Sequence, residues 1–167
     1  HEINNFKQLA QALSTYASMC AAKLRKEQSC AKNIHIMIFT NPFKNNINYR
    51  GYKKITLDTP TNDGLEIVTQ AMKGLRSIYK SNCVYKKAGV IVSDIVPESQ
   101  VQLSLFKSTN HKKRKYLMMA MDKINNNSNK IDLRFAINGF DRKKLIKQEN
   151  LSPCYTTQLS DLLRIKK

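Results

Sequence analysis

Apolar residues between positions 4 and 27 recur at steps of three and four, and this stripe limits the possible folds more than any other feature of the sequence. Its members are Phe6, Leu9, Ala10, Leu13, Tyr16, Ala17, Cys20, Ala21 and Leu24. Such spacing predicts an amphipathic helix. Lys23, Arg25 and Lys26 fall in its last turn, where the helix dipole favours cations. A helix with one apolar face needs a second layer of structure to cover it.

The spacing then changes to strict alternation, which predicts strands. Between Ile34 and Thr40 an isoleucine stands at every second position, and the residues between them point to the opposite face. Asn41-Pro42 ends this strand. A second strand is predicted from Gly51 to Thr59, ended by Pro60, and a third from Tyr85 to Val96.

A second helix is predicted between these strands, over about Asp63 to Lys80. Thr61, Asn62 and Asp63 offer side chains that can cap its first turn. Its expected buried residues are Leu65, Val68, Ala71, Met72, Leu75, Ile78 and Tyr79. The resulting order, α-β-β-α-β, predicts an α+β fold in which two helices cover a mostly antiparallel sheet.

The C-terminal part has the pattern of a separate module. Residues 98–111 form a polar linker with one short apolar segment, which divides the chain into units 1–97 and 112–167. A helix is expected from about Lys112 to Asn126, with Leu117, Ala120, Met121 and Ile124 on its packing face. A strand is expected over 131–138, before a basic tail. The second unit is therefore predicted to be a small α/β extension.

Several classes of protein are excluded by what the sequence lacks. No apolar run approaches the roughly 18 residues of a membrane span, and no signal peptide opens the chain. The chain begins with His1 rather than Met, so a fragment of a longer protein is expected. The four cysteines are Cys20, Cys30, Cys83 and Cys154. Their wide spacing favours reduced thiols and a cytoplasmic location over disulfides or a zinc site.

No catalytic or metal-binding group is evident. The aspartates at 58, 63, 94, 122, 132 and 141 are scattered singly, whereas two-metal chemistry needs converging carboxylates. This also leaves a small nuclease without support. The three histidines, His1, His35 and His111, stand apart, and His35 is interpreted as a packed or surface residue rather than a ligand. No cofactor is expected.

The charge of the chain indicates a polyanionic partner. Twenty-nine Lys and Arg residues against twelve Asp and Glu give a formal net charge of +17. Basic residues gather at two strand starts: Arg50, Lys53 and Lys54 cluster with Tyr52 in one case, and Lys86 and Lys87 stand together in the other. We interpret them as contacts to DNA phosphates, because the sheet face opposite the helices is free. The alternative is that they are solvated charges that protect strand edges from aggregation.

The segment Gln102, Leu103, Ser104, Leu105 and Phe106 is the apolar part of the linker. Its apolar side chains have no neighbours in the linker to pack against. They would suit a peptide that docks into a pocket on a partner protein. They would equally suit a linker that folds back onto its own module.

Three stretches resemble one known family. They are residues 85–97, YKKAGVIVSDIVP, then QLSLF at 102–106, and LSPCYTT at 151–157. Together they resemble the C-terminal region of the UmuC family of Y-family translesion DNA polymerases, and the resemblance extends over nearly the whole chain. It implies a βαββαβ little-finger domain up to about Pro97, whose sheet contacts the backbone of the template-primer duplex. It also implies that Gln102 to Phe106 bind the bacterial sliding clamp and that the extension contacts a UmuD′-like subunit.

The chain departs from the family pattern in two ways. The palm domain, which carries the catalytic carboxylates and Mg²⁺, lies upstream in the family, so this chain is not expected to polymerise DNA. The first little-finger strand is also expected to be absent, since the sequence opens at the predicted helix. We expect the resulting free sheet edge to be filled by another chain or by the strand near Ile131. A second hypothesis is a protein-interaction module that recruits UmuD′-type partners, with DNA contact incidental.

Overall fold

The computed structural model describes residues 2–43, 47–102, 111–127 and 133–139 of the 167-residue chain. Its elements, in order, are α1 (Phe6–Lys26), β1 (Ser29–Thr40), β2 (Arg50–Thr61), α2 (Gly64–Ile78), β3 (Tyr85–Pro97), the 3₁₀ turn η1 (Glu98–Gln100), α3 (His111–Asn127) and the 3₁₀ turn η2 (Ala136–Asn138).

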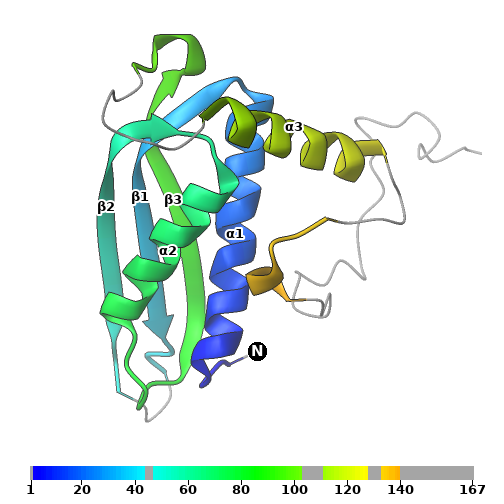
Figure 1. Cartoon of the computed structure of the whole chain (residues 1–167). Helices are drawn as coiled ribbons and strands as arrows, with labels where there is room; N and C mark the ends of the chain where they lie inside the picture. Colours follow the sequence, from blue (N-terminus) through cyan, green and yellow to red (C-terminus); the bar gives the residue numbers. More distant parts are fainter. Residues whose placement is uncertain (1, 44–46, 103–110, 128–132, 140–167) are drawn as a thin grey trace, which may run out of the picture.

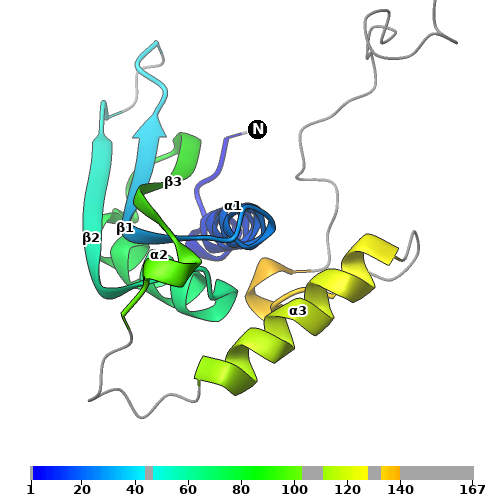
Figure 2. The ribbon, with the colours of Figure 1, turned by 90° about the horizontal axis from the view of Figure 1, so that it is seen from above.

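The strands of the described residues form one antiparallel sheet in the order β2-β1-β3. Helices α1 and α2 lie together on one face of this sheet (Figure 1), and the view from above leaves its other face open (Figure 2). Ile34, Ile36 and Ile38 of β1 are fully buried against the helices. The predicted α+β fold, with its order α-β-β-α-β, is confirmed.

A side-chain cap marks the first turn of each of the helices α1 and α2. Asn5 accepts a hydrogen bond from the backbone N–H of Lys7 at the start of α1, at 2.8 Å. Asp63 accepts one from the N–H of Leu65 at 2.9 Å and caps α2, as predicted. The predicted burial of Leu65 is wrong, since 46% of it is exposed and Ile67 is buried instead. Leu65 lies in the first turn, on the outer side of the helix.

The strands are longer than predicted. β1 begins at Ser29 rather than Ile34, because Ser29 to Ala31 already pair with the end of β3. β2 continues through Pro60 to Thr61. Pro60 does not end the strand because β2 lies at the edge of the sheet, where a residue without an N–H loses no ladder bond.

The other edge of the sheet is β3. Ile3 forms a single antiparallel bridge with Tyr85 there, with both N–H···O distances at 2.8 Å. No further strand joins this edge within the described ranges. The hypothesis that the segment near Ile131 fills the edge is therefore wrong for the residues described there, 133–139.

The strand predicted for 131–138 is also wrong for those residues, which end in η2 and lie against α1. The hydroxyl of Ser14 donates to the carbonyl of Ile137 at 3.2 Å, and Asn138 Nδ2 donates to Ser18 Oγ at 3.2 Å. Alternating apolar residues indicate that one side of a segment is buried. A β-strand also needs a neighbouring segment whose backbone N–H and C=O groups are free to bond with it. The backbone of α1 is already bonded within the helix.

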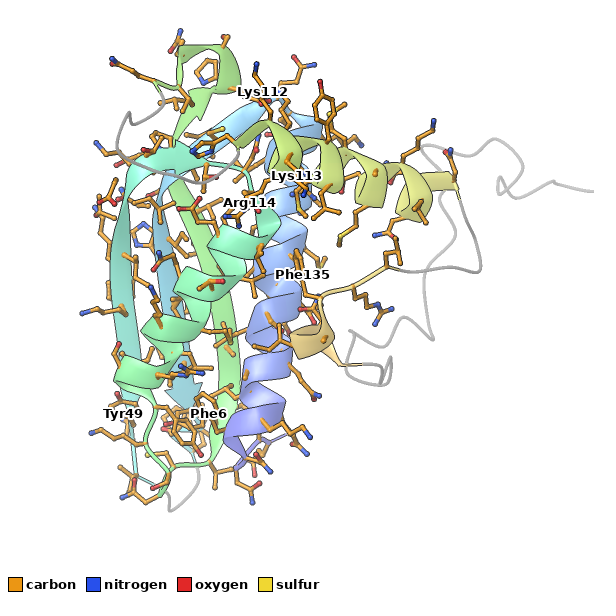
Figure 3. The ribbon with its side chains drawn as sticks, viewed as in Figure 1. Phe6, Tyr49, Lys112, Lys113, Arg114 and Phe135 are labelled. Carbon is orange, nitrogen blue, oxygen red and sulfur yellow. The ribbon has the colours of Figure 1, made fainter. Side chains whose placement is uncertain are left out.

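Helix α3 forms close to the predicted range but packs through a different face. Met118 is 3% exposed, whereas Leu117 is 60% exposed and Ile124 is 40% exposed. Met118 and Phe135 both approach Gly64 at the start of α2, where a Cβ would lie 3.1 Å from the Phe135 ring. Figure 3 labels Phe135. Of the expected packing face, Leu117, Ala120 and Ile124 are wrong because they are exposed, whereas Met121 is half-buried. Contacts made by Met118 and by charged side chains decide the orientation of the helix.

Candidate nucleic-acid interface

The open face of the sheet is built by every second residue of its strands. On β1 these are His35, Met37 and Phe39, which alternate with the buried isoleucines. Strand register places the residues beside them. The residues of β2 opposite His35, Met37 and Phe39 are, in that order, Lys54, Tyr52 and Arg50. The residues of β3 opposite the same three are Ile91, Gly89 and Lys87. Register therefore brings Arg50, Tyr52, Lys54 and Lys87 together on one face.

The other two predicted basic residues lie elsewhere. Lys53 is opposite Ile36, so it belongs to the register of the helix-covered face, although it is exposed on the edge strand. Lys86 stands at the irregularity in β3, where Phe39 pairs with Lys87 and Thr40 with Tyr85. Neighbouring lysines in a strand point to opposite faces, so closeness in sequence does not give a shared surface.

The cations of the open face are available to a ligand. Arg25, Arg114 and Lys115 form ion pairs with carboxylates in the described ranges. Arg50, Lys54 and Lys87 have no carboxylate partner among the described residues, and all three are exposed. An exposed group of unpaired cations on a sheet face can bind phosphate groups without reading bases.

His35, interpreted from the sequence as a packed or surface residue rather than a metal ligand, lies on the central strand of this face. The Nδ1 atom of His35 is 2.5 Å from Tyr52 Oη, and its Nε2 atom is 2.7 Å from Ser93 Oγ. The imidazole thus bridges a hydroxyl on β2 and a hydroxyl on β3. Alternation alone could place His35 on the open face, but only strand register shows the two hydroxyls beside it.

The carboxylate of Asp94 lies beside the same face. Asp94 has a positive φ of 53° and accepts a hydrogen bond from Nδ2 of Asn33. Asn33 is 1% exposed, and its Oδ1 atom has no hydrogen-bond partner among the described residues. The negative charge of Asp94 therefore marks the end of the face beyond Ser93, away from Arg50 and Lys87.

The predicted clamp-binding peptide lies almost entirely outside the described residues. Gln102 is described and exposed, whereas Leu103, Ser104, Leu105 and Phe106 are not described. In the described part of the chain, no three His, Cys, Asp or Glu side chains gather into a group that could hold a metal ion. None of the described helices is long and apolar enough to cross a membrane.

Comparison with known proteins identifies the family of the chain that carries this face. The family pattern described as the impB/mucB/samB family C-terminal domain matches residues 1–105, which include the whole sheet and both covering helices. The chain belongs to the impB/mucB/samB family. Residues 115–165 match a second pattern, described only as a domain of unknown function.

Individual members of the impB/mucB/samB family align with nearly the whole chain. The protein UmuC of Salmonella typhimurium is 36% identical over 166 residues, which are 98% of the chain and 39% of UmuC. The protein SamB of Salmonella typhimurium is 32% identical over 162 residues, 96% of the chain and 38% of SamB. MucB of Escherichia coli is 32% identical over 157 residues, 93% of the chain and 37% of MucB. The chain thus spans less than two-fifths of the length of these relatives.

Proposed function

We propose that the chain is the DNA-binding and clamp-tethering region of a UmuC-like, error-prone translesion DNA polymerase. The observation that carries the proposal is the open sheet face with Arg50, Tyr52, Lys54 and Lys87, whose cations have no carboxylate partner among the described residues. Membership of the impB/mucB/samB family supports it. The chain itself would supply binding, and we expect it to extend no primer when isolated.

Binding through such a face would be independent of DNA sequence. Contacts to phosphates hold a duplex in place but carry no base information. Each phosphate that a cation neutralises releases counterions, so the affinity should fall steeply as salt rises.

Matched pairs of charge variants test the proposal. Arg50→Ala/Lys54→Ala removes two cations from the open face, and Lys73→Ala/Arg76→Ala removes two exposed cations from α2 on the opposite side. We expect the first variant to weaken duplex binding about tenfold and to reduce the slope of log affinity against log salt by about 2. The α2 variant should change both much less. Equal effects of the two variants would show that net charge, rather than the open face, determines binding.

The clamp tether is a second part of the proposal. The peptide from Gln102 to Phe106 would dock its leucine and phenylalanine side chains into a pocket on the bacterial sliding clamp, and a weak contact of this kind would keep the polymerase near the primer end. We expect Leu105→Ala/Phe106→Ala to abolish binding of purified clamp without changing thermal unfolding. Undiminished clamp affinity in this variant would refute the tether.

A protein-interaction role is the second candidate, and the surface of α3 favours it. Tyr116, Leu117 and Met119 are between 54% and 72% exposed, and three such large apolar side chains lie within four residues of one helix. A UmuD′-type subunit is the partner that the family resemblance implies. Leu117→Ser/Met119→Ser should then lose binding to purified UmuD′ while DNA affinity stays unchanged. Retained binding to UmuD′ would exclude this face of α3 as the contact.

A further inference from the structure

His35 lies where a DNA phosphate would approach the open face, and its hydrogen bonds suit such a ligand. The imidazole lies between Tyr52 Oη, 2.5 Å from Nδ1, and Ser93 Oγ, 2.7 Å from Nε2. A hydroxyl group can donate one hydrogen bond and accept others. The bridge can therefore persist whether the imidazole is neutral or protonated.

The two charge states differ in what they offer to a ligand. A neutral imidazole donates from one nitrogen and accepts at the other, so one of the two hydroxyls must give its proton to the ring. A protonated imidazole donates from both nitrogens, and both hydroxyls then accept. Their own O–H groups become free to turn toward solvent. The protonated state thus presents one positive charge and two hydroxyl donors on the same face.

The groups around the imidazole favour an anion on the β2 side. On β2, the exposed Lys54 lies directly opposite His35, and Tyr52 is 56% exposed. On β3, the uncharged Ile91 lies directly opposite. The carboxylate of Asp94 follows Ser93 on β3 and accepts a hydrogen bond from Asn33. On β2, the exposed Asp58 stands four residues beyond Lys54. The next residue of β1 on this face is the apolar Met37, which lies between His35 and the end of the face that carries Arg50.

We infer that His35, Tyr52 and Ser93 form a binding site for a backbone phosphodiester of DNA, next to Lys54, and that this site takes up a proton from solvent as the phosphate binds. The inference rests on the proposed function, since it names one contact within the open face. A phosphodiester has several acceptor oxygens and one fixed negative charge, which match two hydroxyl donors and a cation. Histidine is the side chain that ordinarily changes charge between pH 5 and 8.

The pH dependence of duplex binding tests the inference. The affinity of the full chain for a short rhodamine-labelled DNA duplex is measured at constant ionic strength between about pH 6 and pH 8, the range in which histidine titrates. We expect the chain to bind about three- to tenfold more tightly at the lower pH, the size expected from one charge-assisted contact. His35→Gln should lose this dependence, because glutamine still hydrogen-bonds but does not titrate. His111→Gln, a change of the same kind in α3, should retain it.

Two further measurements separate a phosphate site from a merely structural network. Tyr52→Phe and Ser93→Ala each leave His35 in place but remove one outward hydroxyl donor, so each should weaken binding at low pH more than at high pH. Calorimetry of duplex binding in two buffers of different ionisation enthalpy should detect proton uptake for the unchanged chain and none for His35→Gln. Circular dichroism checks that every variant is folded.

The outcomes distinguish this inference from the proposed function. If duplex binding is unaffected by Arg50→Ala/Lys54→Ala, the proposed function fails and the inference fails with it. If binding depends on those cations but His35→Gln retains the full pH dependence and the same proton uptake, only the phosphate site is refuted. Loss of both in His35→Gln, with both retained in His111→Gln, supports it.

Discussion

Tyr85 joins three parts of the molecule at one end of the sheet. It is 1% exposed, and its hydroxyl accepts a hydrogen bond from the N–H of Lys80 at 2.7 Å and donates one to the carbonyl of Lys80 at 3.0 Å. Its ring lies close to those of Tyr49 and Tyr79, and Phe6 meets Tyr79 edge-on (Figure 3). The hydroxyl thus holds the turn after α2 against the start of β3.

Tyr85→Phe tests the importance of that hydroxyl. The change leaves the N–H of Lys80 without its partner and leaves the Lys80 carbonyl with only the 3.4 Å bond from the N–H of Cys83. We therefore expect it to lower the free energy of unfolding by about 1–3 kcal/mol. Tyr79→Phe is the control, because the Tyr79 hydroxyl makes only a long, exposed bond of 3.4 Å to Asn4. It should cost less than about 0.5 kcal/mol. Urea unfolding measures both, and equal losses would contradict this role of Tyr85.

Cys30 gives a prediction about pH at the same scale. Burial, together with the nearby Glu98 carboxylate, raises the pKa of the Cys30 thiol from 9.0 to about 11, while Lys115 and a backbone hydrogen bond from Asn62 act in the opposite direction. The folded state holds the thiol proton more tightly than the unfolded state. The stabilising contribution is therefore complete below pH 9 and is lost as the pH rises toward 11.

Comparison with Cys30→Ala isolates this contribution from other groups that titrate in alkali. We expect the chain to be more stable than Cys30→Ala at pH 8, and the difference to shrink at about pH 10.5, within the range bounded by the two pKa values. Urea unfolding of both proteins at each pH provides the measurement. A stability difference that is the same at both pH values would contradict the assigned role of the thiol.

At the scale of elements, α2 packs closely against the sheet at Gly74. A Cβ added there would collide with Ile36 Cδ1 and lie 2.9 Å from Ile55 Cδ1. We expect Gly74→Ala to lower the free energy of unfolding by about 1–3 kcal/mol from overpacking, despite the roughly 1 kcal/mol by which alanine favours a helix.

Gly89→Ala is the matched control for that change. Gly89 lies on the open face, where the nearest atom to an added Cβ is Met37 Cγ at 3.3 Å, on a flexible side chain. Thermal unfolding should show a clearly larger loss for Gly74→Ala than for Gly89→Ala. A Gly74→Ala variant as stable as the unchanged chain would mean that α2 does not pack as closely as described.

Helix α3 is held on the first unit by charged contacts. Arg25 of α1 binds both carboxylate oxygens of Asp122, at 2.6 and 2.7 Å, and also donates to the carbonyl of Asn62 at 2.9 Å. The side chain of Arg25 is 12% exposed. Arg114 and Lys115 pair with Asp63 and Glu98 in the same region (Figure 3). The α3 contact is therefore expected to weaken when one of the buried partners is removed.

Asp122→Asn tests this contact, because it leaves the charge of Arg25 mostly buried without a carboxylate. We expect backbone amides of α3 to exchange with deuterium at least several-fold faster, while those of β1 stay protected. Glu98→Gln is the control, since its partner Lys115 is 59% exposed and a surface pair contributes little. If neither variant changes exchange in α3, ion pairs do not hold this helix in place.

The elements differ in how far the sequence could predict them. α1 and β1 were predictable because their apolar residues recur with the period of a helix and of a strand, respectively. The packing face of α3 was not, because Met118, Arg114 and Asp122 contact residues that are distant in sequence. The residues at 133–138 kept a strand pattern, but they lie against α1, whose backbone groups are already bonded within the helix. For the site, alternation gave the open face of β1, whereas the bridge from His35 to Tyr52 and Ser93 required the register of both neighbouring strands.

At the scale of the whole molecule, the account depends on two unlike faces of one sheet. One face is covered by α1 and α2, and the other carries exposed cations and the His35 bridge (Figure 2). The net charge of +17 attracts polyanions to the entire surface, so affinity for DNA alone does not identify the interface. The central claim concerns which face the duplex contacts.

The most direct measurement is a nuclear magnetic resonance titration of the isotope-labelled chain with a short DNA duplex. The account predicts that shift changes gather on the open face, at Arg50, Tyr52, Lys54 and Lys87, and that added salt reverses them. Residues on the outer side of α2, such as Lys73 and Arg76, should shift little. Changes centred on α2, or spread evenly over all basic residues, would contradict the open face as the DNA-binding surface.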